Sequence, residues 1–89
     1  MGDVDAILSE RGLRYGLFKN HASISQKLKF EMQVHEGWNR MDSDQREALE
    51  MIAHKIACIL NGDPDYADSW VDIAGYAQLV AGRLSGIVR

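Results

Sequence analysis

The sequence predicts an all-α fold, a small helical bundle formed by a single domain over residues 1–89. Apolar residues recur in most segments with the helical period of 3.6 residues, and the chain contains a single proline, Pro64. Hydrophobic residues make up 46% of the chain and charged residues 26%, as in ordinary globular domains. A chain of 89 residues is long enough to form one core.

Two shorter helices are predicted in the N-terminal part of the chain. The first is expected over residues 4–11, where Gly12 favours an end. Residues 13–20 are expected to form a connector. The second helix is expected over residues 22–35 and ends before Gly37.

The third helix is expected over about residues 43–60 and has the clearest start signal. Asp42 can cap the first turn, and Gln45, three residues later, can reach back to the Asp42 backbone. Asn61-Gly62 then favours a left-handed C-terminal cap. The apolar side of this helix is expected to face the core through Leu49, Ile52, Ile56, Ile59 and Leu60.

The fourth helix is expected over about residues 64–84. Asp63 is a suitable N-cap, and Pro64 suits the first helical position. The short turn between the two long helices predicts that they are antiparallel neighbours. The buried side of the fourth helix is expected to contain Trp70, Ile73, Ala74, Ala77, Val80, Ala81 and Leu84.

Carboxylates on the two long helices are the most informative feature for function. Glu47, Glu50 and His54 fall within roughly 60° of arc on one helix, and Asp68 and Asp72 fall within roughly 40° on the next. Four carboxylates gathered by an antiparallel pair repel one another unless a hard cation such as Mg²⁺ lies among them. The pattern therefore predicts a metal site. It also predicts that Asp72→Asn would stabilise a protein that binds no metal.

The alternative is that these acids form solvated helix faces. On the third helix they lie almost opposite the apolar side, as water-facing charges do. However, the acidic lines continue into Cys58 on one helix and into Gly75 and Leu79 on the next. Small or apolar residues of this kind are typical of a helix–helix contact. Both interpretations stay open at the level of the sequence.

Charge and cysteine content narrow the classes of function. The formal net charge of -3 offers no general attraction to nucleic acid, which disfavours nucleic-acid binding. The single cysteine, Cys58, is expected to exclude both an internal disulfide and any cysteine-based zinc site, and to be a small buried packing residue. The sequence shows neither a signal peptide nor an apolar run of the roughly 20 residues that cross a bilayer. We therefore expect a cytosolic protein without a membrane partner.

The stretch from Glu47 to Ala77 resembles the all-α nucleotide pyrophosphohydrolases, the superfamily of MazG-like proteins and dimeric dUTPases. Its members carry a Glu-x-x-Glu pair on one helix and a Glu-x-x-Asp pair on the next, which together hold Mg²⁺. Glu47-Ala48-Leu49-Glu50 matches the first pair, and Asp72 matches the final aspartate. Asp68 departs from the pattern because it precedes Asp72 by four residues rather than three, and Arg46 replaces an additional glutamate that members often have.

A closer resemblance connects the chain to a group of small phage and prophage proteins. It rests on Arg14-Tyr15-Gly16, Glu47 to Lys55, Asn61-Gly62-Asp63-Pro64 and Asp68 to Tyr76. This resemblance covers most of the chain and implies a location in the cytoplasm of a phage-infected bacterium. It implies no established activity.

The wider resemblance implies a Mg²⁺-dependent hydrolase, with Mn²⁺ as a substitute, that converts a nucleoside triphosphate into a monophosphate and pyrophosphate. Glu47, Glu50 and Asp72 would be catalytic and, together with Asp68, would bind the metal. Cationic, aromatic and imidazole side chains are expected to hold the nucleotide. They are Arg14, Tyr15, Lys19 and His21 on a loop, with His54 and Lys55 beside the carboxylates of the two long helices.

The second hypothesis is a non-catalytic phage accessory protein that binds a host protein or sequesters a nucleotide. The small size of the chain, the missing glutamate at Arg46 and the spacing of Asp68 favour it. Under either hypothesis we expect a homodimer or a larger homo-oligomer. Assembly would cover the carboxylates of the two long helices and would stabilise a domain that is too small to form a large core.

Overall fold

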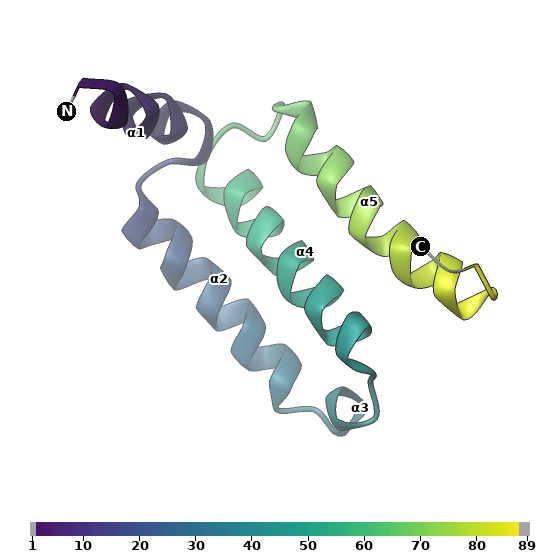
Figure 1. Cartoon of the computed structure of the whole chain (residues 1–89). Helices are drawn as coiled ribbons and strands as arrows, with labels where there is room; N and C mark the ends of the chain where they lie inside the picture. The colour runs from purple at the N-terminus through teal and green to yellow at the C-terminus, as the bar shows by residue number, and fades with distance from the viewer. Residues whose placement is uncertain (1, 88–89) are drawn as a thin grey trace.

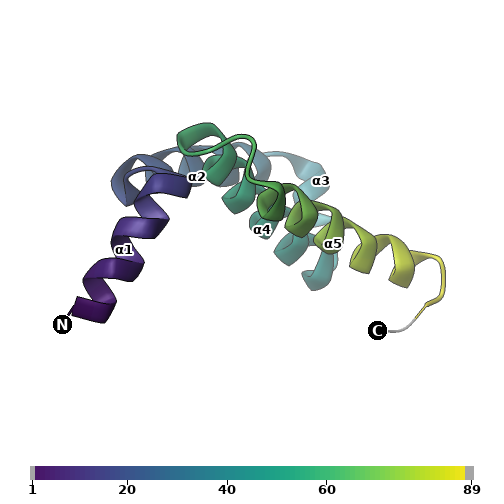
Figure 2. The same ribbon diagram turned by 90° about the horizontal axis from the view of Figure 1, so that it is seen from above.

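The computed structural model describes residues 2–87 and confirms the all-α fold, with no strand among those residues. The helices are α1 (Gly2–Tyr15), α2 (Phe18–Gln33), α3 (Glu36–Asn39), α4 (Ser43–Asn61) and α5 (Ala67–Leu84). Helix α4 lies between α2 and α5, which pack on its two sides (Figure 1). Seen from above, these helices form a single curved layer, and α1 projects from one end of it (Figure 2).

The predicted ends of the two long helices meet different outcomes. Helix α4 starts where expected, and the Asp42 backbone N–H donates a hydrogen bond to Gln45 Oε1 at 2.8 Å. The left-handed cap expected at its end is wrong, because Gly62 has φ −129°. Helix α5 starts at Ala67, three residues later than expected. The reason is local, because the Asp63 carboxylate accepts a hydrogen bond from the Asp65 backbone N–H at 2.9 Å and caps a turn instead of a helix. Pro64 therefore precedes α5.

The expected connector over residues 13–20 is much shorter in the structure. Only Gly16 and Leu17 separate α1 from α2. Helix α1 continues through Gly12, whose carbonyl accepts a hydrogen bond from the Gly16 N–H at 2.9 Å. Gly16 has φ +77°, so this glycine rather than Gly12 provides the left-handed end of the helix.

The second expected helix is also shifted. Helix α2 begins at Phe18 and ends at Gln33, so it starts four residues earlier and ends two residues earlier than predicted. Residues 36–39, for which no helix was expected, form the single turn α3. The prediction of two short N-terminal helices is thus correct in outline but omits α3.

The buried core is small and consists of small side chains. The buried hydrophobic residues all belong to α4 and are Ala48, Ala53, Ala57 and Cys58. Several residues expected in the core are instead exposed, with Leu60 at 67%, Trp70 at 55% and Leu84 at 61%. The expectation that these side chains fill the core is wrong, because the buried hydrophobic residues of α4 are small and these larger side chains remain in contact with solvent.

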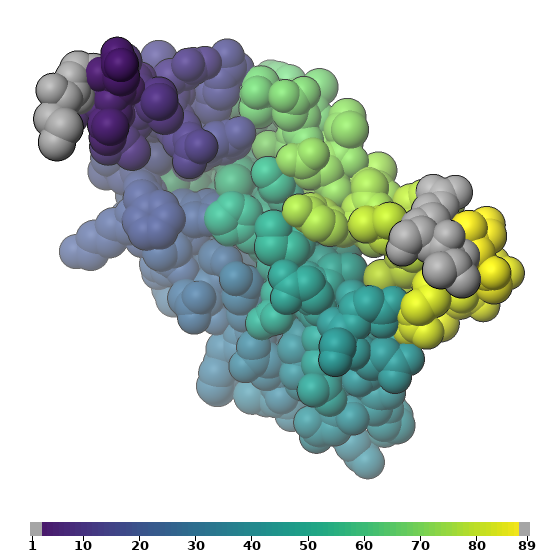
Figure 3. All heavy atoms as spheres, in the orientation of Figure 1, coloured from purple at the N-terminus to yellow at the C-terminus, as the bar shows by residue number. Residues whose placement is uncertain are grey.

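One side of the layer is left uncovered. In Figure 3 the side chains of α4 are visible between those of α2 and α5. An apolar groove between α4 and α5 is lined by residues that include Leu49, Ile52, Val80 and Leu84. The accessible surface is 6445 Å², whereas a compact monomer of 10.0 kDa exposes about 5,200 Å². The chain therefore exposes about 1,200 Å² more surface than its mass requires.

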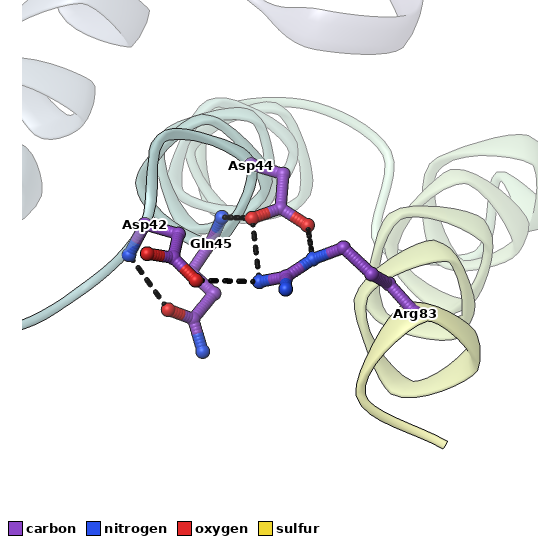
Figure 4. Close-up of polar contacts among 4 residues, drawn as sticks. All are labelled: Asp42, Asp44, Gln45 and Arg83. Atoms are coloured by element: carbon purple, nitrogen blue, oxygen red, sulfur yellow. Dashed lines mark hydrogen bonds and ion pairs between the residues drawn. The ribbon is translucent and has the colours of Figure 1, made fainter. Parts of the chain in front are cut away.

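Arg83 connects the end of α5 to the start of α4 (Figure 4). Its Nη2 donates to Asp42 Oδ2 at 3.0 Å and to Asp44 Oδ1 at 2.8 Å, and its Nε donates to Asp44 Oδ2. The hydrogen bonds with Arg83 lower the pKa of the Asp44 carboxyl, and those with Asp44 raise the pKa of Arg83. The two long helices are thereby fixed in register at this end.

Candidate functional site

Two segments that are far apart in the sequence meet where α1 ends and the α4–α5 turn begins (Figure 1). The Asn61 side-chain amide donates to the backbone oxygens of Tyr15 at 2.8 Å and Leu17 at 2.9 Å. The Asp63 backbone N–H donates to the Arg14 oxygen at 2.6 Å. A Cβ atom at Gly62 would lie 1.9 Å from that oxygen, so only glycine fits there. This contact places the end of α1 beside the start of α5.

Aromatic and charged side chains gather at this contact. The Arg14 guanidinium lies 4.4 Å from the centroid of the Tyr66 ring, and the rings of Tyr15 and Tyr66 meet edge to face with centroids 6.1 Å apart. The Tyr66 hydroxyl donates to Asp68 Oδ2 at 2.9 Å, which raises the pKa of the tyrosine. Arg14 also pairs with the exposed Glu10 at 3.3 Å.

Lys55 and Asp72 form an ion pair across α4 and α5. Their Nζ and Oδ2 atoms are 2.8 Å apart, and the side chains are 18% and 45% exposed, respectively. The hydrogen bond with Asp72 is the main cause that raises the pKa of Lys55, and Tyr15 makes a smaller contribution. We use the name junction site for Arg14, Tyr15, Lys55, Tyr66, Asp68 and Asp72.

The ion pair corrects one expectation. The sequence predicted that Asp72 faces other carboxylates, so that neutralising it would relieve repulsion. Asp72 instead faces the ammonium group of Lys55. Asp72→Asn therefore removes a favourable contact and is expected to destabilise the fold rather than stabilise it.

The glutamate pair of α4 lies away from Asp72. Glu47 is exposed, and Glu50 Oε1 accepts a hydrogen bond from Gln33 on α2 at 3.4 Å. Because Lys55 is level with Asp72, Glu50 is displaced by about 7.5 Å along the α4 axis. Within residues 2–87, the four carboxylates do not form a group around one point. The four-acid metal set stays a prediction.

The remaining predicted nucleotide ligands are outside the junction site. Lys19 is exposed in the first turn of α2. His54 Nδ1 lies 3.2 Å from His21 Nε2, between α4 and α2. His21 was expected on a phosphate-binding loop, but it lies inside α2 and is 5% exposed.

The family model described as a domain of unknown function (DUF6378) matches residues 3–84. The chain belongs to this family. The DUF6378 match spans the five helices nearly from end to end and includes the whole junction site. No curated protein and no solved structure matches the chain. Among the described residues of this DUF6378 chain, no helix has the length and apolar character needed to cross a membrane.

Sequence reasoning missed two features of the DUF6378 chain. Tyr66 was not singled out, and its position two residues before Asp68 in the α4–α5 turn gives no signal that it meets Arg14. The contact of His21 with His54 and Cys58 was also missed. A partial signal existed, because His54 and Cys58 are four residues apart and so lie on one face of a helix.

Proposed function

We propose that this DUF6378 chain is a MazG-like, Mg²⁺-dependent nucleoside triphosphate pyrophosphohydrolase that binds its substrate at the junction site. The observation that carries the proposal is the half-exposed Asp72 carboxylate beside the Lys55 ammonium, next to the rings of Tyr15 and Tyr66. A carboxylate suits Mg²⁺, a cation suits phosphate, and aromatic faces suit a nucleobase. By the resemblance described above, we place the protein in the cytoplasm of a phage-infected bacterium.

The separation of the carboxylates is compatible with Mg²⁺ chemistry. Mg²⁺ usually keeps several waters and binds one or two carboxylates together with substrate phosphates, rather than a cage made only of protein. Asp72 is the direct ligand in this proposal. Glu47 and Glu50 then act through waters of the metal, because the offset along α4 separates them from Asp72.

Substrate binding exchanges the partners of the charged groups. Asp72 would hold Mg²⁺, and Lys55, released from its ion pair, would neutralise phosphate charge. Arg14 lies over the Tyr66 ring and supplies a second cation at the same end of the helices. A bound Mg²⁺ would supply Lewis-acid chemistry for the attack of water on the α-phosphorus, in which the bond from the α-phosphorus to the bridging oxygen is broken and pyrophosphate is the leaving group.

A thermal-shift titration tests whether metal and nucleotide bind. Nucleoside triphosphate with Mg²⁺ or Mn²⁺ is expected to raise the Tm, because a ligand that binds only the folded state stabilises it. At a hundred times Kd the gain is about 2.7 kcal/mol, or a Tm rise of roughly 11 to 22 °C for a domain of this size. Glu50→Gln should reduce the rise while its Oε1 still accepts the Gln33 hydrogen bond.

The matched control is Glu31→Gln, which removes an exposed acid of α2 that pairs with His35 outside the junction site. This variant should keep the full rise in Tm. A wild-type Tm that does not move with millimolar Mg²⁺ and nucleotide together would count against the enzyme.

A specific observation supports a second function, the non-catalytic phage accessory protein. In a single chain the Asp72 carboxylate is already neutralised by Lys55, and Glu50 accepts a hydrogen bond from Gln33 on α2. These two carboxylates therefore have partners without a metal. Such a protein would sequester a nucleotide or bind a host protein. A Tm rise with nucleotide but no hydrolysis would indicate that the protein sequesters the nucleotide. If nucleotide neither raises the Tm nor is hydrolysed, a host protein is the expected partner.

A further inference from the structure

A compact group of metal-ligating side chains lies where α2 packs on α4. His21 Nε2 is 3.2 Å from His54 Nδ1, and Cys58 Sγ is 3.7 Å from His21 Nδ1. Each residue can offer one ligand atom such that all three atoms lie within 4.8 Å of one another. His21 and Cys58 are 5% and 4% exposed, and His54 is half-buried.

The helices explain why these side chains converge. His54 and Cys58 are one turn apart on α4 and project from the same face, a spacing that allows two side chains of a helix to share one ion. His21 reaches the same point from α2. The Phe18 ring is stacked on the His21 ring with centroids 6.0 Å apart and an interplanar angle of 25°, which restricts the orientation of the imidazole.

We propose that His21, His54 and Cys58 form a binding site for a borderline transition-metal ion, best matched by Zn²⁺. This proposal departs from the expectation that a single cysteine excludes a zinc site, because two histidines supply the other ligands. Two imidazole nitrogens and one thiolate suit Zn²⁺, whereas Mg²⁺ prefers oxygen ligands. Three protein ligands leave a fourth position for water or an added ligand, as in open zinc sites. The site uses none of the carboxylates of the junction site and does not depend on the proposed hydrolase activity.

The distances agree with a tetrahedral ion. Zn–N bonds of about 2.0 Å and Zn–S bonds of about 2.3 Å place neighbouring ligand atoms roughly 3.3 to 3.6 Å apart. His21 Nε2 and His54 Nδ1 are already 3.2 Å apart, whereas Cys58 Sγ contacts the other ring nitrogen of His21, Nδ1, at 3.7 Å. Because His21 binds an ion through one nitrogen, one of these two contacts is replaced when the ion binds. Because all three ligand atoms lie within 4.8 Å of one another, the group needs a contraction of no more than about 1.5 Å to bind the ion.

The pKa values of the two histidines are shifted in the direction that favours metal binding. Burial, with the charges of Lys29 and Lys55, lowers the pKa of His21, and burial is also the main cause that lowers the pKa of His54. Burial therefore disfavours the charged imidazolium, which cannot bind a metal, at both positions. Burial raises the pKa of the Cys58 thiol, so the ion displaces a thiol proton when it binds. Among the described residues no buried side-chain nitrogen or oxygen lacks a hydrogen bond, and the ion would replace the existing contacts within the group.

Titration of the full chain with Co²⁺ and Zn²⁺ tests the site. We expect one equivalent of Co²⁺ to give the visible bands of a tetrahedral ion and a thiolate-to-cobalt charge-transfer band, and we expect Zn²⁺ to displace it. Cys58→Ser should abolish the charge-transfer band. Both Cys58→Ser and His54→Gln should weaken Zn²⁺ binding by about 100-fold, because loss of a direct ligand costs at least as much as loss of the residues that support it.

The third histidine of the chain provides the control. His35 is exposed near the end of α2 and pairs with Glu31, so His35→Gln should leave the spectrum and the affinity unchanged. Cys58→Ser should also keep the Mg²⁺-dependent Tm rise, which separates failure of this site from failure of the hydrolase proposal. Far-UV circular dichroism shows whether each variant is folded.

Three results would overturn the proposal. The first is a wild-type chain that binds no stoichiometric Co²⁺ or Zn²⁺, which decides the matter even if a variant does not fold. The second is a cobalt spectrum without a thiolate band. The third is an equal loss of affinity in His35→Gln, which would show that the ion binds exposed histidine instead.

Discussion

At the scale of single residues, both the junction site and the group of His21, His54 and Cys58 consist of side chains whose partners come from other helices. Lys55 is held by Asp72 across α4 and α5, and His54 is held by His21 across α4 and α2. Neighbouring positions on α4 therefore serve two different contacts. This arrangement separates an exposed group that suits oxygen-binding ions from a buried group that suits softer ions.

The two buried histidines predict a defined dependence of stability on pH. Their pKa values are lowered from the ordinary value of 6.5, first by burial. The unfolded chain therefore binds more protons below about pH 6.5, so the free energy of unfolding should fall as the pH is lowered from about 7 to about 5. Asp44 acts in a lower range, because its pKa is lowered from 3.8 and its contribution is lost only below that value.

Urea unfolding with a chelator present, at several pH values in this range, measures the effect. His54→Gln should flatten the dependence, because one of the two buried imidazoles is gone. His35→Gln should retain it, since His35 is exposed. Equal slopes in wild type and His54→Gln would show that the buried pair does not control the response.

At the scale of helices, the sequence predicted what depends on local signals and missed what depends on distant contacts. The start of α4 was correct because Asp42 and Gln45 are near one another in the chain. The start of α5 was wrong because the Asp63 side chain caps a turn that the N-cap rule did not include. The antiparallel pairing of α4 with α5 followed from the short turn between them, but the ion pair of Lys55 with Asp72 was not predicted. The contact of α1 with the α4–α5 turn also required the fold itself.

The contact between α1 and the α4–α5 turn predicts a strong effect of one glycine substitution. Gly62→Ala should lower the free energy of unfolding by roughly 2 to 3 kcal/mol, because the new Cβ would lie 1.9 Å from the Arg14 oxygen and the backbones must separate. Chemical denaturation measures the change. The loss should be accompanied by weaker nucleotide binding, because Arg14 and Tyr15 move with α1.

Gly12→Ala is the matched control. Gly12 lies inside α1, and a Cβ atom there meets nothing within 4 Å. The substitution should stabilise the helix by up to about 1 kcal/mol. If Gly62→Ala were as stable as the Gly12→Ala chain, the close approach of the two backbones would not exist in solution.

At the scale of the whole molecule, the chain has more surface than a 10.0 kDa monomer needs. The excess of about 1,200 Å² exceeds the roughly 800 Å² that each partner buries in a typical protein–protein interface. The groove between α4 and α5 is apolar and includes the 61% exposed Leu84. A layer with such a groove is well suited to pack against a second copy of itself.

We therefore predict a homodimer or a larger homo-oligomer at micromolar concentration. Light scattering should give a mass of at least twice 10.0 kDa. Leu84→Lys should shift the mass toward the monomer, because it places a charge in the groove, whereas Phe30→Lys on α2 should not. A wild-type mass of one chain would contradict the assembly.

The proposed function requires Asp72 for the hydrolysis of a nucleoside triphosphate. The most direct measurement is the release of pyrophosphate from a panel of nucleoside triphosphates with Mg²⁺, using wild type, Asp72→Asn and the control Asp65→Asn. The control removes the same charge from an exposed residue of the α4–α5 turn. Asp72→Asn should cost about 1 kcal/mol of stability through the lost ion pair, so the assay is run where circular dichroism shows it folded.

Under the proposed function, we expect the wild-type chain and Asp65→Asn to release pyrophosphate rather than orthophosphate, and we expect Asp72→Asn to lose most of this activity. A wild-type chain that releases no pyrophosphate from any member of the panel, although metal and nucleotide are bound, would contradict the proposed function and support a protein that binds without catalysis.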